Sequence, residues 1–131
     1  MRQKKKSEFL TEVELEFMTV LWNIQTGSVR DVLANLEEGR NLAYTSAATI
    51  LRILEQKEFV ISTKQGKTFV YQPLLAKDAY QARSLKNLSE KLFDDTPASL
   101  VARLVDDTDL TEESLEEIRA LLDRRLKNGS G

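Results

Sequence analysis

The sequence predicts a mainly α-helical chain with one small β-hairpin, arranged as an N-terminal winged helix-turn-helix followed by a C-terminal helical region. Two observations carry this prediction. Apolar residues recur with helical spacing in three successive segments, residues 11–24, 28–37 and 43–57. At residues 59–71 the pattern changes to two short runs of β-branched and aromatic residues, separated by a turn that contains glycine.

Length and composition limit what this chain can do. With 131 residues it can bury one sizeable core. It contains no Cys and no His, which excludes disulfides, zinc fingers, thiolate metal sensors and Ser-His or Cys-His catalytic groups. We therefore expect no metal site, no cofactor and no enzyme. No apolar run approaches the roughly 20 residues that span a bilayer, and MRQKKKSEF leads into no secretory signal, so a soluble, cytoplasmic protein is expected.

Composition and pattern divide the chain into four parts. These are a flexible basic arm at residues 1–9, a winged-helix domain at 10–75, a helical dimerisation domain at 76–127 and a flexible tail at 128–131. Residues 1–75 hold 10 Lys and Arg against 9 Asp and Glu, whereas residues 76–131 hold 9 against 12. Because the pI is only about 5.3, any contact with nucleic acid must come from a local basic patch.

Two short helices come first. Thr11 and Glu14 form a predicted capping box, in which each side chain accepts a hydrogen bond from a backbone N–H at the helix start. This helix should end near Ile24, with Trp22 on its buried stripe. Ser28 is the expected N-cap of a second helix that runs through Glu37, and Gly39 should close it.

The stretch Ala43–Phe59 predicts a third helix with two different faces. Its buried stripe consists of Ala47, Ile50, Leu51 and Leu54. The other face begins with hydroxyl side chains and continues with longer polar ones, in the order Tyr44, Thr45, Ser46, Thr49, Arg52, Gln56 and Lys57. A solvated face would favour Glu and Lys, because Ser and Thr are weaker helix formers. Short hydroxyls let a backbone approach a base edge or a phosphate, so this pattern indicates a recognition helix.

Phe59–Thr63 and Thr68–Tyr71 are the predicted strands of a hairpin that follows this helix as a wing. Its tip carries Lys64, Gln65 and Lys67, which suit contact with a phosphate backbone. An ordinary solvated hairpin tip is the alternative interpretation. Pro73 should end the second strand because it donates no ladder hydrogen bond, and a domain boundary is expected near Leu75.

The remaining chain predicts three helices, at about residues 77–93, 97–105 and 112–127. Their apolar residues are too few to close a core alone, so we expect them to close it with a second copy. The expected dimerisation residues are Leu88, Leu92, Phe93, Leu100, Val101, Leu104, Leu115, Ile118 and Leu122. Runs of acidic residues such as Asp94-Asp95 are explained by solvated helix faces and helix starts more simply than by metal or acid–base chemistry.

The order of motifs resembles the BlaI/MecI/CopY family of penicillinase-type repressors. The most specific matches are Leu42-Ala43-Tyr44-Thr45, Val70-Tyr71-Gln72-Pro73-Leu74 and Leu110-Thr111-Glu112-Glu113, within a resemblance that runs from about Leu10 to Leu126. It implies a winged-helix repressor that binds a palindromic double-stranded DNA operator as a homodimer. It places Thr45, Ser46 and Thr49 at base-reading positions and Lys64 and Lys67 along the backbone, while Arg52 faces the same way by helical geometry alone.

The sequence also departs from that family pattern. Some members release DNA when a membrane-bound sensor protease triggers cleavage of an Asn-Phe bond, so a sensor or protease is a further partner that the resemblance implies. Here Arg103-Leu104 stands at that position, and the C-terminal Cys cluster of copper-responsive relatives is missing. Glu58 replaces a common Gly after the recognition helix, where a non-Gly residue must adopt a helix-ending conformation.

Two hypotheses from different classes follow. The first is a sequence-specific DNA-binding repressor that acts as a dimer. The second is a winged-helix adaptor that holds a protein partner on the same surface. The adaptor would need a more apolar exposed face than Tyr44, Thr45, Ser46 and Thr49 provide.

Overall fold

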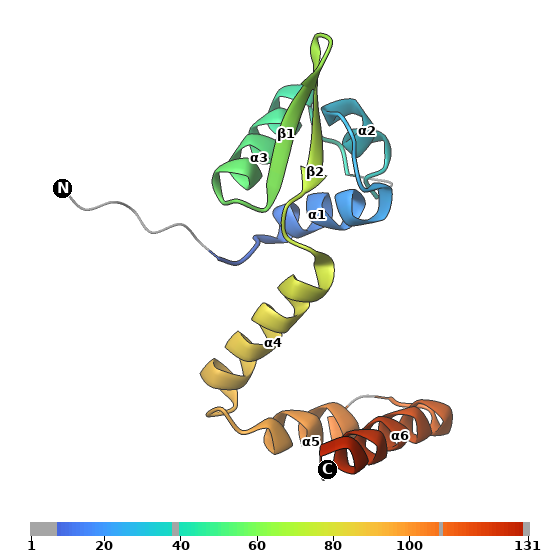
Figure 1. Cartoon of the computed structure of the whole chain (residues 1–131). Coiled ribbons are helices and arrows are strands. Elements are labelled where there is room, and N and C mark those ends of the chain that lie inside the picture. Colours follow the sequence, from blue (N-terminus) through green and yellow to red (C-terminus); the bar gives the residue numbers. More distant parts are fainter. Residues whose placement is uncertain (1–7, 38–39, 108, 130–131) are drawn as a thin grey trace, which may run out of the picture. The chain divides into compact units, whose positions relative to one another are not determined.

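A computed structural model describes residues 8–37, 40–107 and 109–129. Contacts divide the chain into two compact units, Met1–Ser84 and Leu85–Gly131. The elements, labelled in Figure 1, are α1 (Glu12–Ile24), α2 (Val29–Ala34), α3 (Tyr44–Gln56), β1 (Val60–Gln65), β2 (Thr68–Pro73), α4 (Lys77–Leu92), α5 (Pro97–Asp107) and α6 (Glu112–Gly129). The structure is therefore mainly helical with a two-stranded antiparallel hairpin, as the sequence predicts.

The first two helices begin at the predicted caps. The Thr11 hydroxyl accepts from the Glu14 N–H, and Glu14 accepts in return from the Thr11 N–H at 2.9 Å. Ser28 caps α2 in the same reciprocal way with Asp31. However, α2 ends at Ala34, earlier than the predicted Glu37, since its C-cap Asn35 turns its side-chain amide back to the Asp31 carbonyl at 2.8 Å. Gly39, expected to close α2, lies outside the described residues.

The hairpin is longer than predicted and has a tighter turn. Its register runs from Val60 opposite Pro73 to Gln65 opposite Thr68, so only Gly66 and Lys67 form the loop. Gly66 has a φ of 64°, a left-handed conformation that glycine adopts without steric cost. β2 also pairs with the connection between α1 and α2, where Gly27 and Tyr71 exchange two backbone hydrogen bonds of 2.9 and 2.8 Å.

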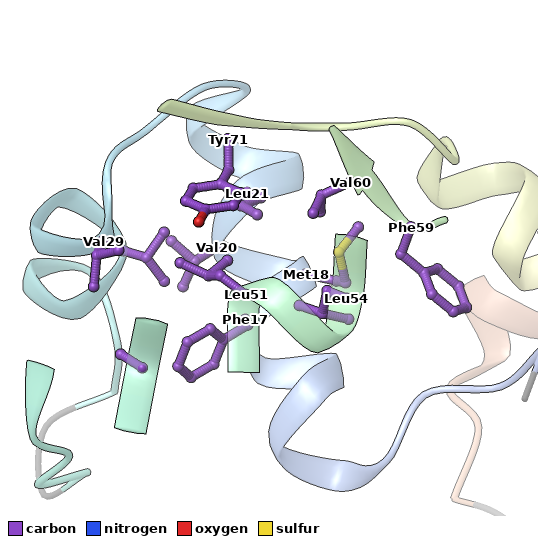
Figure 2. Close-up of a cluster of buried hydrophobic side chains, with 12 residues drawn as sticks. Phe17, Met18, Val20, Leu21, Val29, Leu51, Leu54, Phe59, Val60 and Tyr71 are labelled. Carbon is purple, nitrogen blue, oxygen red and sulfur yellow. The ribbon is translucent and has the colours of Figure 1, made fainter. Parts of the chain in front are cut away.

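One hydrophobic core lies in the first unit. Figure 2 shows side chains from α1, α2, α3 and the hairpin converging on it. Its buried members are Phe17, Met18, Val20, Leu21, Val29, Val32, Ala47, Leu51, Leu54, Phe59, Val60 and Tyr71. Ile50, predicted to be buried, is half-buried and packs at the edge. Trp22 packs there too, and its indole N–H donates to the Leu75 carbonyl at 3.0 Å.

The start of α4 packs on this first unit. The Tyr80 ring lies 5.7 Å from the ring of Phe59 and 6.1 Å from that of Trp22, and the Tyr80 hydroxyl accepts from the Leu10 N–H at 2.8 Å. Consequently α4 begins within the first unit, which extends to Ser84 and thus past the boundary expected at Leu75.

The helices α4, α5 and α6 contain no buried residue. Among the predicted dimerisation residues, Leu88, Leu92, Val101, Leu104, Leu115 and Leu122 are exposed, while Phe93, Leu100 and Ile118 are half-buried.

Thr111 caps α6 by accepting from the Ser114 N–H at 3.0 Å. α5 runs two residues past its predicted end at Val105, and α6 runs past Lys127. Within the described residues, no helix has the length and apolar character needed to cross a membrane.

Candidate nucleic-acid interface

The predicted polar face of α3 is exposed, and we call Tyr44, Thr45, Ser46 and Thr49 the hydroxyl ridge. All four side chains are exposed, as is Arg52 further along the same helix. The opposite stripe of α3 is buried in the core, so packing fixes which side of the helix faces outward. Thr45, Ser46, Thr49 and Ile50 line a shallow groove on this face. The hydroxyl ridge is therefore available to a partner.

The N-terminus of α3 differs from those of α1 and α2. Those two helices have capping boxes and acidic residues in their first turns. α3 has Ala43 as its N-cap, no side-chain cap and no acidic residue in its first turn. A helix leaves its first N–H groups without intrahelical acceptors, and its dipole is positive at that end. The start of α3 thus suits an external anion such as a phosphate.

Within the hydroxyl ridge, Thr49 already uses its hydroxyl hydrogen. Its Oγ1 donates to the Thr45 carbonyl at 3.0 Å, one turn earlier on α3. What remains for a partner is the lone pairs of the oxygen and the side-chain methyl group. Thr49 can therefore accept a hydrogen bond or make an apolar contact, but it cannot donate in this rotamer.

Arg30 is a site residue that the sequence interpretation missed. It is exposed in the first turn of α2, and its guanidinium lies 5.1 Å from the centroid of the Tyr44 ring. A cation over an aromatic face is attracted by the ring quadrupole. The helix-turn-helix thus brings a positive charge beside the hydroxyl ridge. No local pattern connects the two residues, because the contact arises from the packing of α2 against α3.

The wing, Val60–Pro73, places its basic tip in the open. Lys64, Gln65 and Lys67 are all exposed. The base of the wing is tied to α3, because Glu55 accepts hydrogen bonds from the Ser62 N–H at 3.1 Å and from the Ser62 hydroxyl at 2.8 Å. Recognition helix and wing are therefore joined by a fixed polar contact.

Lys57 requires a correction. The sequence placed it on the polar face of the third helix, among residues that could reach phosphates. Its Nζ instead lies 2.6 Å from the Glu14 carboxylate and 2.9 Å from the Phe9 carbonyl, and its side chain is only 12% exposed. The Lys57 ammonium therefore makes its contacts within the first unit, where it connects the end of α3 to the start of α1. Helical periodicity could not reveal this because the partners are distant in sequence.

The same contact changes the acidity of Glu14. Burial alone would raise its pKa, but hydrogen bonds from Lys57 and Thr11 and the positive charge of Lys57 outweigh burial. The pKa of Glu14 is therefore lowered from its ordinary value of 4.5. Glu14 stays ionised at neutral pH and holds Lys57 away from the interface.

Glu58, which follows α3, has a φ of 67°. A non-Gly residue in this region ends the helix at some energetic cost, as the sequence predicts. The Phe59 N–H then donates back to the Leu54 carbonyl at 2.9 Å, and the chain turns into β1. This turn sets the wing directly after the recognition helix.

A larger hollow lies between α1 and the described residues Asn35, Leu36, Glu37 and Arg40. Its charged lining residues are Glu12, Glu16, Glu37 and Arg40, with Arg40 paired to Glu16. The excess of carboxylates disfavours phosphate there. The hydroxyl ridge and the wing are therefore the better candidates for contact with DNA.

Comparisons with known proteins agree with this geometry. The protein family described as penicillinase repressor matches residues 10–124. The methicillin resistance regulatory protein MecI of Staphylococcus aureus (strain Mu50 / ATCC 700699) is 24% identical over 120 residues, which cover 92% of this chain and 98% of MecI. The penicillinase repressor of Bacillus licheniformis is 24% identical over 119 residues, covering 91% and 93%. The solution structure of the DNA-binding domain of the repressor BlaI superposes with a TM-score of 0.50 and 27% identity, covering 60% of this chain and 94% of that domain.

Proposed function

The chain belongs to the penicillinase repressor family of DNA-binding transcriptional repressors, and from that premise we propose that it acts as a cytoplasmic homodimer on a palindromic operator. The observation that carries the proposal is the exposed hydroxyl ridge of α3 beside the basic wing. Such a polar ridge fits the major groove of a DNA duplex, which admits an α-helix.

In this proposal the hydroxyl ridge reads bases. Thr45 and Ser46 lie in the first turn of α3, and Thr49 lies one turn further. Since the Thr49 hydroxyl hydrogen is bonded to the Thr45 carbonyl, Thr49 would accept from an adenine or cytosine amino group or touch a thymine methyl. Thr49 therefore favours particular bases through acceptance and apolar contact.

Basic groups around the ridge would hold the phosphate backbone. Lys64, Lys67 and Arg52 are exposed, with Gln65 as a polar neighbour at the wing tip. Arg30 extends this basic rim to α2, where Tyr44 supports its guanidinium. Contacts of this kind set orientation and add affinity without selecting a sequence.

The apolar side chains of α4, α5 and α6 support the homodimer. Leu92 is 71% exposed and Leu104 is 48% exposed, values that are costly for leucines facing water. A second copy would cover them. Two-fold symmetry would then place the two α3 helices about one duplex turn apart, roughly 34 Å, or a multiple of it, which matches a palindrome.

Fluorescence anisotropy with the palindrome upstream of the protein's own operon tests the proposal. We expect binding that survives excess competitor DNA at moderate salt. Affinity should fall as salt rises, with a log–log slope near −0.9 for each neutralised phosphate. Loss of all binding in the presence of competitor would refute sequence-specific repression.

Two variants separate base reading from backbone contact. Thr49→Ala should reduce discrimination between operator and altered sequences by about 1–3 kcal/mol. Lys67→Ala should weaken binding to every sequence alike and lower the salt slope by about 1. If Thr49→Ala also weakened all sequences equally, Thr49 would not read bases.

A sensor or protease co-regulator remains a proposed partner. Arg103 and Leu104, at the position where some family members are cleaved, lie within the α5 helix, and Arg103 pairs with Asp107 at 3.0 Å. A protease would have to unwind α5 or act on another bond. The adaptor hypothesis gains no support, since the exposed start of α3 offers hydroxyls rather than an apolar surface.

A further inference from the structure

Phe69 is an aromatic side chain of the wing that the core does not cover. It lies in β2 and is 51% exposed. Tyr71, two residues along the same strand, is buried, as is Val60 at the base of the wing. The core therefore ends just before Phe69. What the Phe69 ring can meet is decided by the face of the wing on which it lies.

The register of the hairpin places Phe69 on the face of the wing that is turned toward α3. Residues paired across an antiparallel hairpin share a face, and the face alternates along each strand. Phe69 is paired with Lys64. On the same face, two residues toward the base of each strand, Tyr71 is paired with Ser62, and Ser62 donates to Glu55 of α3. We call this face, which carries Ser62, Lys64, Phe69 and Tyr71, the inner face of the wing.

The inner face of the wing continues the candidate interface of α3. The pKa of the Tyr71 hydroxyl is raised, mainly by burial and then by Glu55 and Tyr44, while the positive charge of Arg52 acts in the opposite direction. Tyr44 and Arg52 belong to the exposed polar face of α3. The inner face thus lies within electrostatic range of that polar face. Phe69 extends it by about 7 Å toward the hairpin tip, which projects beyond the helices of the first unit in Figure 1.

The surroundings of Phe69 are basic. Lys64 lies directly opposite it, and Lys67 lies two residues before it in the turn; both are exposed. The wing sequence Val60–Pro73 contains no acidic residue. Lysines at this tip suit the phosphates of a DNA backbone. Each phosphate in that backbone is flanked by deoxyribose, whose carbon atoms are its apolar part, so a ring between two such lysines is well placed for a sugar.

We propose that Phe69 packs against deoxyribose in the minor groove next to the major groove that α3 enters. This contact rests on the proposed function, because it assigns a further residue to the same DNA-binding surface. The minor groove is only about 6 Å wide, so the sugars of its two walls are close together. Apolar side chains are a recurrent part of minor-groove contacts. Phe69 thus adds affinity through apolar contact, without adding charge.

Ile61 offers a matched control on the other face of the wing. It is also apolar and is 42% exposed, and it is paired with Gln72. Because faces alternate along a strand, Ile61 lies on the face opposite Phe69. The proposal therefore assigns no DNA contact to Ile61.

Substitution of Phe69 separates this sugar contact from the phosphate contacts of the wing. In fluorescence anisotropy with the operator palindrome, Phe69→Ala should raise the dissociation constant by about tenfold, because about half of a phenylalanine side chain loses its cover. The log–log salt slope should stay that of the unaltered chain, since no charge is removed, whereas Lys67→Ala should lower it. Ile61→Ala should leave the affinity nearly unchanged. Urea unfolding followed by Trp22 fluorescence checks folding, and Phe69→Ser replaces Phe69→Ala if that variant does not fold.

Hydroxyl-radical footprinting locates the contact, because hydroxyl radicals attack deoxyribose from the minor groove. We expect the unaltered chain to protect sugars across the minor groove beside each half-site, Phe69→Ala to lose this protection and Ile61→Ala to keep it. Unchanged protection in Phe69→Ala, or equal losses of affinity in Phe69→Ala and Ile61→Ala, would overturn the contact while operator binding itself stands. If the unaltered chain does not bind the operator, the proposed function fails, and the contact fails with it.

Discussion

Both units of this chain contain helices with clear boundaries, but among the described residues only the first unit has buried side chains. In the first unit, Phe17, Met18 and Leu51 are completely buried. In α5 and α6 no residue is buried, although Thr111 caps α6 as Thr11 caps α1. Local signals for a helix therefore do not reveal whether that helix has something to pack against. The first unit buries its apolar side chains itself, whereas the apolar side chains of α5 and α6 are exposed or half-buried.

The largest expected effect is the loss of stability when a core side chain of the first unit is removed. Phe17→Ala should destabilise the first unit by about 3–5 kcal/mol, because it removes a large, completely buried side chain and leaves a cavity in the core. Urea unfolding followed by Trp22 fluorescence measures this. Leu15→Ala, an exposed position on the same helix, should cost far less. If Phe17→Ala prevents folding, Phe17→Leu gives a smaller cost with the same sign.

The buried ion pair of the first unit gives the next largest effect. Glu14→Gln should destabilise that unit by about 2–3 kcal/mol, since it removes the negative charge that compensates the nearly buried Lys57 ammonium and leaves only neutral acceptors beside it. Glu12→Gln, exposed at the start of the same helix, should stay within about 0.5 kcal/mol. Equal costs for both variants would contradict the role assigned to Lys57.

Glu14 also predicts a pH dependence. Its pKa is lowered in the folded state from an ordinary value of 4.5. The folded state therefore binds fewer protons there than the unfolded state, and the stabilisation is complete above about pH 4.5. It is lost as the pH falls through the lowered folded value. Glu14→Gln should remove this part of the acid sensitivity, as thermal melts between neutral and acidic pH can check.

For the second unit, the expected effect is on dimerisation, which depends on protein concentration. Leu122 is 54% exposed in the single chain, so a dimer could cover only about half of its surface. Burying that half would contribute about 1 kcal/mol per copy. Leu122→Ala should therefore raise the dimer dissociation constant in sedimentation equilibrium and leave urea unfolding of the first unit unchanged. Glu116→Gln, an exposed residue on another side of α6, is the control. An equal loss of dimerisation in both variants would argue against a dimer interface at Leu122.

The smallest expected effect concerns the exposed ion pair of α5. Arg103 and Asp107 are separated by one helical turn, and their side chains are 71% and 51% exposed. Solvent and salt screen such a pair, so Arg103→Ala should change stability by at most about 0.5 kcal/mol. Thermal melts at low and high salt would measure it. A cost well above that value would indicate that Arg103 makes a further contact, such as one in the proposed dimer.

Much of the fold was predictable because its signals are local. The capping residues Thr11 and Ser28 lie three residues from their partners, and the change of period after Lys57 marks the hairpin within a few positions. The hydroxyl ridge was equally visible, since helical spacing alone assigns Thr45 and Thr49 to the face opposite the buried stripe. Exposure of that ridge is confirmed, and its role in reading bases remains a prediction.

What the sequence did not reveal depends on contacts between distant segments. The pairing of Lys57 with Glu14 joins the ends of two helices, and Arg30 meets Tyr44 only after α2 packs on α3. Tyr80 contacts Phe59 and Trp22 across the expected boundary at Leu75. No periodicity encodes such pairs. The early end of α2 was hidden for a different reason, because Asn35 competes with the helix for the Asp31 carbonyl.

The two backbone hydrogen bonds between Gly27 and Tyr71, together with the Glu55–Ser62 contact, hold the helices and the wing together before any partner binds. Parts that are joined beforehand lose little conformational entropy when they meet a duplex, so less of the contact energy is spent on ordering them. A side chain at position 27 would meet the end of the Ile24 side chain (Cδ1) at 2.7 Å and Asp31 Cβ at 3.1 Å, so these neighbours would have to shift to make room for it. The preorganisation of α3 and the wing thus involves a backbone contact at Gly27, which lies outside the exposed face of α3.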